Sequence, residues 1–201
     1  MIPLALTVLG IPTLASRMGL KSISVSNILF MLLVPLAGAP MISVYGFESN
    51  LGNFFYAAVV LGVAYKAWFH GKQEAIRCIN YIFFANVILF LILNVVHYSV
   101  GISIYDTSTR IALASFASFL VGQRMLVHLL SQFRRHSIYI VMPTVMVLVQ
   151  AVDSVLFFPM AFGYVLPFGT IVTIAVNGFL IKSALALLSV PFLYVSTYGR
   201  N

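Results

Sequence analysis

Apolar runs of about 20 residues recur along the whole chain, and each could cross the roughly 30 Å hydrocarbon core of a bilayer as a helix. In lipid, only a helix or a closed barrel pairs all of its own backbone groups. The runs are continuous rather than alternating, which argues against a barrel. Only 7% of the 201 residues are charged, whereas soluble domains carry roughly 25%. The sequence therefore predicts an all-α fold, a polytopic bundle of transmembrane helices.

The positions of the runs predict one transmembrane domain over residues 1–201. We expect residues 1–21 to form an accessory first helix and residues 22–201 to form a six-helix core. Prolines interrupt the second run at Pro35 and Pro40 and the last run at Pro191. The expected runs are 2–16, 24–47, 51–69, 79–98, 110–130, 138–162 and 168–195.

The net charge of +7 has a regular distribution along the chain. Basic residues gather in alternate connections between the runs, whereas Glu48 and Asp106 lie in the other connections. Because basic connections stay in the cytoplasm, we expect a multi-pass protein of the cytoplasmic (inner) membrane with a cytoplasmic C-terminus. This explanation of the charge leaves no reason to expect a nucleic-acid partner. The basic residues in or beside these alternate connections are Arg17, Lys21, Lys66, Lys72, Arg77, Arg134 and Arg135.

The few polar side chains inside the runs are the candidates for a binding site, because an ionised group near the bilayer centre costs roughly 2.5–3.5 kcal/mol. Gln150 and Asp153 lie mid-run about 60° apart around a helix and share a face. Lys182, the only charged residue of the last run, is the natural partner of Asp153. Asn177 precedes Lys182 by five residues and points about 140° away from it. Two simpler interpretations stay open: an ion pair that only fixes packing, and snorkelling of Lys182 to the interface.

The fifth run adds Gln123, which follows the small residues Ala114, Ser118 and Gly122. Small residues at every fourth position let another helix approach closely, so we expect Gln123 to be buried against protein. Asn86 in the fourth run can line the same cavity, although a lone amide is more often an interhelical hydrogen bond.

No enzyme signature appears: the sequence has no Walker loop, no H-E-x-x-H, no G-x-S-x-G and no Cys/His cluster. Four acidic residues leave few acid–base pairs, and the single Cys78 cannot form an internal disulfide. We expect a protein that is not an enzyme and that holds no metal or cofactor.

Four segments occur in an order and spacing that resemble a known family. Arg110–Gln123 reads R-I-A-L-A-S-F-A-S-F-L-V-G-Q, and Gln150–Ser154 reads Q-A-V-D-S. Lys182 lies inside the last run, and Gly71–Arg77 reads G-K-Q-E-A-I-R. Together they resemble the queuosine-precursor transporter family, also called vitamin-uptake-transporter-like, over roughly residues 70–195. Three positions that are acidic in that family hold Ala64, Trp68 and Leu126 here.

This resemblance implies a membrane transporter that imports a 7-deazaguanine base such as preQ0, preQ1 or a queuine-like base. It likens the fold to the membrane-embedded binding subunits of energy-coupling-factor vitamin transporters. Asp153 would accept hydrogen bonds from N1–H and the 2-amino group of the base, with Gln123 and Gln150 at its other polar edge and Lys182 holding Asp153. The expected substrate-binding residues are Asp153, Gln150, Gln123, Lys182, Arg110, Asn86 and Asn177.

The partners that we expect are a small planar base and the lipid bilayer. A homodimer and an energising partner both stay open at this point. Two other functions also stay open. The chain can be a substrate-binding subunit that needs a separate energising module, or a structural membrane protein that transports nothing.

Overall fold

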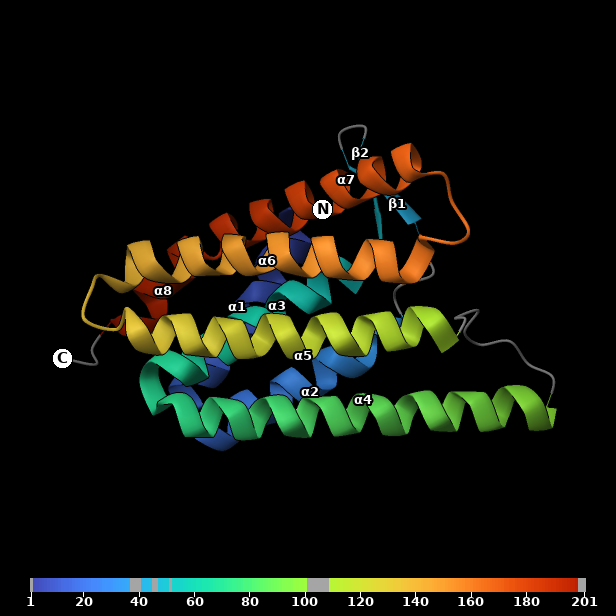
Figure 1. Cartoon of the computed structure of the whole chain (residues 1–201). Coiled ribbons are helices and arrows are strands. Elements are labelled where there is room, and N and C mark those ends of the chain that lie inside the picture. The colour runs from blue at the N-terminus through green and yellow to red at the C-terminus, as the bar shows by residue number, and fades with distance from the viewer. Residues whose placement is uncertain (1, 37–40, 45–46, 51, 101–108, 199–201) are drawn as a thin grey trace.

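The computed structural model describes residues 2–36, 41–44, 47–50, 52–100 and 109–198. Its helices lie side by side in one bundle (Figure 1), which confirms the predicted all-α membrane fold. The helices are α1 Ile2–Met18, α2 Leu20–Leu36, α3 Gly52–Tyr65, the π-helix η1 Lys66–His70, α4 Lys72–Val100, α5 Thr109–Gln132, α6 Ile138–Phe162, α7 Phe168–Leu188 and α8 Val190–Thr197.

Four helices of the described chain are long and apolar enough to cross a bilayer: 72–99, 109–132, 138–162 and 168–197. The helices α1 and α2 have 17 residues each, at the lower limit of the roughly 17–25 that a crossing takes, and α3 continues directly into η1, so that this helical segment ends at His70. Four of the expected crossings therefore have full length, and the three shorter helices pack into the same bundle.

The second apolar run does not form one helix over residues 24–47. The helix α2 ends at Leu36, and the strands β1 Met41–Val44 and β2 Phe47–Asn50 follow as an antiparallel pair. Pro35 in the last turn of α2 favours an end here, because proline cannot donate the backbone hydrogen bond that continues a helix. The side chain of Glu48 and all of Asp106 lie outside the described residues, so the charge of these two connections stays a prediction.

The short helix α3 runs through the centre of the bundle. It contacts α1, α2, α5, α6 and α7, and 12 of its 14 residues are buried. A helix that is apolar on every side is stable in a protein core or in lipid, and the contacts of α3 place it in the core of the bundle. The position of α3 therefore sets which side chains of the outer helices can meet inside the bundle.

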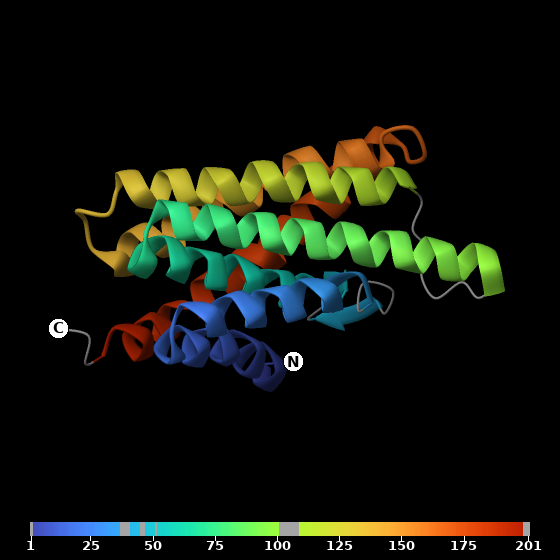
Figure 2. The same cartoon turned by 90° about the horizontal axis from the view of Figure 1, so that it is seen from below.

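The connections after α1, η1 and α5 lie at one end of the bundle, together with the end of α8 (Figure 2). There, Arg17 donates hydrogen bonds to the backbone oxygens of Val195 and Tyr198, each at 2.8 Å. Tyr139 stacks on Tyr194 with ring centroids 4.3 Å apart, so α8 joins α1 to α6. We call this the basic end, defined by Arg17, Lys21, Lys72, Arg77, Arg134 and Arg135.

Candidate functional site

A buried ion pair joins α6 to α7. The Lys182 Nζ donates to Asp153 Oδ2 at 2.6 Å. The exposed fractions are 3% for Asp153 and 6% for Lys182, so the lysine does not snorkel to an interface. An isolated charge in this setting would be very costly, and each charge here is compensated by the other.

Tyr56 of the central helix α3 completes the pair. Its hydroxyl donates to the second carboxylate oxygen, Asp153 Oδ1, at 3.2 Å. Its ring lies beneath the Lys182 ammonium, with 5.1 Å between Nζ and the ring centroid, within the range of cation–π attraction. One tyrosine thus contacts both members of the pair and ties α3 to α6 and α7.

The two glutamines lie at the level of this pair on neighbouring helices. Gln150 is 12 residues from either end of α6, Ile138 and Phe162, and Asp153 is three residues further along the same face. A Cβ added at Gly122 of α5 would lie 3.4 Å from the Val149 side chain. This close approach of α5 to α6 brings Gln123, the residue after Gly122, to the depth of Gln150.

Buried polar atoms without partners surround the pair. Within the described structure, the amide nitrogen and oxygen of both Gln123 and Gln150 make no hydrogen bond, nor does the Ser154 hydroxyl. The Gln123 amide lies beside the Tyr56 hydroxyl, which places this glutamine next to the pair. Buried polar groups in native proteins are almost always bonded. Unused donors and acceptors next to an ion pair at mid-helix are therefore suited to a polar ligand.

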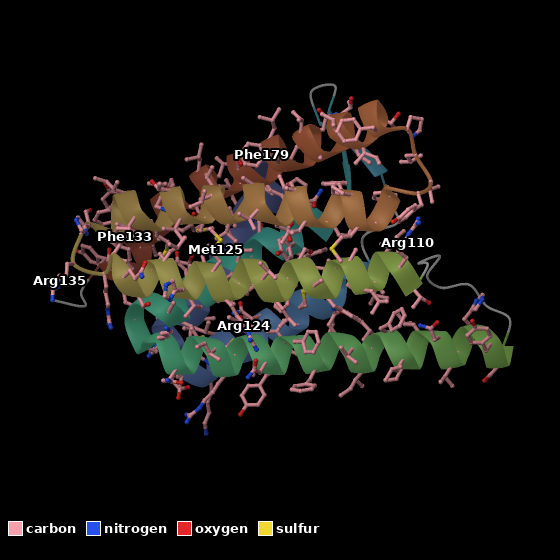
Figure 3. The ribbon with its side chains drawn as sticks, in the orientation of Figure 1. Arg110, Arg124, Met125, Phe133, Arg135 and Phe179 are labelled. Carbon is pink, nitrogen blue, oxygen red and sulfur yellow. The ribbon has the colours of Figure 1, made fainter. Side chains whose placement is uncertain are left out.

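Three predicted site residues lie apart from this cluster. Arg110 is the second residue of α5 and lies at the end of the bundle opposite Arg135 (Figure 3), and 13 residues of helix, about 20 Å, separate it from Gln123. Asn86 is buried on α4, which contacts α2, α3, α5 and η1, whereas the ion pair lies between α6 and α7. Asn177 is half-buried on α7 without a recorded contact to Asp153 or Lys182.

Tyr56 was not among the predicted site residues. It lies in an apolar run with many aromatic residues, where spacing gives no sign of a polar role. Only the central position of α3 brings its hydroxyl to Asp153.

A model of the family described as "Putative vitamin uptake transporter" matches residues 50–196. That match covers most of the chain and includes every residue of the cluster. The chain belongs to this family. It is thus a multi-pass membrane protein of a vitamin uptake transporter family, and the family description names transport rather than catalysis. The comparisons with curated proteins and with solved structures gave no match.

In this member of the family, the cluster has the chemistry of a site for a polar solute that donates and accepts hydrogen bonds. A carboxylate has about four lone-pair positions, and Lys182 and Tyr56 use one on each oxygen of Asp153. Two acceptor positions therefore remain for a ligand, and each glutamine offers an acceptor and a donor beside them.

Proposed function

We propose that this transporter imports a 7-deazaguanine base, such as preQ0, preQ1 or a queuine-like base, through the cytoplasmic membrane. The observation that supports the proposal is the buried Asp153 with two free acceptor positions next to two glutamine amides without partners. The guanine-like edge of such a base offers N1–H and a 2-amino group side by side. One carboxylate can accept both hydrogen bonds, and bonds to a charged acceptor are the stronger kind.

The remaining edge of the base fits the other groups of the cluster. A deazaguanine also presents a carbonyl oxygen and a pyrrole N–H, which need one donor and one acceptor. Gln123 and Gln150 each supply both. An ion pair that only fixed helix packing would not require these amides to stay buried and unbonded, since such groups lower stability. This difference favours a binding site over a purely structural pair.

The orientation of the protein is part of the proposal. The basic end gathers the connections that follow α1, η1 and α5 together with the end of α8. The positive-inside rule assigns such an end to the cytoplasm. The base would then enter from the end that holds the α6–α7 connection and leave at the basic end.

Complementation tests the function. A bacterium that can neither make nor import preQ1 is given the chain and external preQ0 or preQ1, and queuosine in its tRNA is measured. We expect queuosine with the wild-type chain and none with Asp153→Ala at the same membrane level. Absence of queuosine with wild-type protein in the membrane would refute the proposal.

A second measurement separates a transporter from a binding subunit. Purified protein is placed in liposomes, and uptake of labelled preQ0 is followed without any other protein. Uptake supports a transporter that works alone, whereas saturable binding without uptake supports a subunit that needs an energising module.

A further inference from the structure

The buried charges of the described chain do not balance. Its buried charged side chains are Asp153, Lys182 and Lys66, the last with an exposed fraction of 2%. Formally, two ammonium groups oppose one carboxylate. Arg124 does not enter this sum, because its side chain is exposed on the α4 side of α5 (Figure 3). Among the described residues, the buried side chains therefore carry a formal excess of one positive charge.

The one buried carboxylate of the described chain already has a partner on each oxygen. Lys182 binds one oxygen of Asp153, and Tyr56 donates to the other. The only other acid whose side chain the structure describes, Glu74, pairs with Arg77 at 2.5 Å near the basic end. In the described part of the chain, no carboxylate is left to neutralise an incoming cation.

The second ammonium lies on the continuation of the central helix. Lys66 opens η1, ten residues after Tyr56, which corresponds to a rise of about 15 Å. It donates to the Ser24 hydroxyl, a neutral partner. In a medium of low dielectric constant, a charge at this distance still acts on the site. A solute that moves from the site toward the basic end approaches this charge.

Building on the proposed function, we infer that the site selects a neutral base over a cationic one, and that Lys182 determines this preference. The uncommitted groups around the pair are amides and a hydroxyl, which bind a neutral heterocycle. A cationic substituent would lie among ammonium groups without a free counter-ion, and like charges brought together at an interface are strongly unfavourable. The preference thus comes from repulsion of the wrong ligand.

Two deazaguanines that differ in one substituent test this inference. The 7-substituent of preQ0 is a neutral nitrile, whereas that of preQ1 is an aminomethyl group, an ammonium at pH 7. Both dissociation constants are measured by calorimetry on the detergent-purified full chain at pH 7. We expect preQ1 to bind at least about tenfold more weakly than preQ0.

Replacing Lys182 then tests the assigned cause. In Lys182→Met, the Asp153 carboxylate is no longer neutralised by an ammonium, so its charge attracts a cationic substituent across the site and we expect the preference for preQ0 to disappear or reverse. Lys66→Met removes the second buried charge without touching the pair, and we expect it to narrow the preference by about threefold. Asn94→Ala is the matched control, because Asn94 lies on α4 and its amide nitrogen donates to the Phe90 carbonyl of the same helix. It should leave the ratio of the preQ1 and preQ0 dissociation constants unchanged.

The outcomes separate the two proposals. Equal binding of preQ0 and preQ1 by the wild type, or tighter binding of preQ1, overturns the inference and leaves the proposed function standing. Binding of neither base overturns both. A wild-type preference that persists in both lysine variants shows that the buried charges do not cause it. If Lys182→Met fails to fold, Lys66→Met still decides, because an unchanged ratio in that variant contradicts the electrostatic cause.

Discussion

The Lys182 ammonium and the Asp153 carboxylate meet at 2.6 Å between α6 and α7, and both side chains are buried. This pair fixes two helices of the bundle and also places the buried acid at the depth of two unbonded glutamines. Stability and binding therefore depend on the same two residues. Substitutions there must be designed so that the two effects can be told apart.

A double-mutant cycle measures how much the pair contributes to stability, separately from binding. Asp153→Asn or Lys182→Met alone leaves one buried charge without its partner, so we expect each to lower the free energy of unfolding by about 3 kcal/mol. The double variant leaves neither charge, so we expect it to lose less stability than either single variant, which means that more than about 3 kcal/mol of the summed loss is recovered. Unfolding in mixed detergent micelles measures all four proteins. Strictly additive losses would show that the pair has no coupling energy.

Tyr56 offers a finer test of the site. Tyr56→Phe removes the hydroxyl that donates to Asp153 but keeps the ring beneath Lys182. A hydrogen bond to a charged group is worth about 1.5–3 kcal/mol, so we expect preQ0 to bind about tenfold more weakly while the protein stays folded. Tyr56→Leu also removes the ring and should be the less stable variant. Unchanged binding by Tyr56→Phe would exclude the hydroxyl from the site.

Gly62 is predicted to tolerate no side chain. A Cβ added there would lie 1.9 Å from the Oδ1 of Asn27, a buried side chain whose amide nitrogen bonds Cys78 Sγ at 3.7 Å. We expect Gly62→Ala to lower the free energy of unfolding by about 1–3 kcal/mol, as overpacking does. Gly169→Ala on α7 is the matched control, because no atom lies within 4 Å of its added Cβ.

A rescue experiment checks the cause of that loss. Asn27→Ala removes the clashing atoms, so Gly62→Ala should cost less in an Asn27→Ala background than in the wild type. Thermal unfolding in detergent gives both differences. The same cost in both backgrounds would mean that contact with Asn27 is not the reason.

Membrane orientation can be read from labelled cysteines. The native Cys78 is fully buried, so the wild type should not react with an impermeant maleimide. Val165→Cys, in the α6–α7 connection, should react in intact cells. Arg135→Cys, at the basic end, should react only after lysis. The reverse pattern would contradict the proposed orientation.

The sequence was informative where chemistry is concentrated in few residues. In a chain with four acidic residues, an acid and a lysine inside two apolar runs predicted each other as partners, and the structure pairs them. The small residues before Gln123 predicted its burial, and its exposed fraction is 0%.

The sequence did not predict the features that depend on how the helices pack against one another. Tyr56 looks like one more aromatic residue until α3 takes the central position. The second apolar run, interrupted at Pro35 and Pro40, predicted one crossing to residue 47, because hydropathy alone does not distinguish a short strand from the continuation of a helix. The rise along α5 places Arg110 far from Gln123, although both belong to one motif.

The central claim is that the buried Asp153 binds the base. Its most direct test is equilibrium binding of labelled preQ0 to purified protein by scintillation proximity. The test compares the wild type, Asp153→Asn/Lys182→Met, and Asn94→Ala as control. The double variant removes both charges together, so it stays folded while losing the charged acceptor. We predict wild-type affinity for Asn94→Ala and at least about tenfold weaker binding for the double variant. Equal affinity of the folded double variant and the wild type, or no saturable binding by the wild type, would contradict the account.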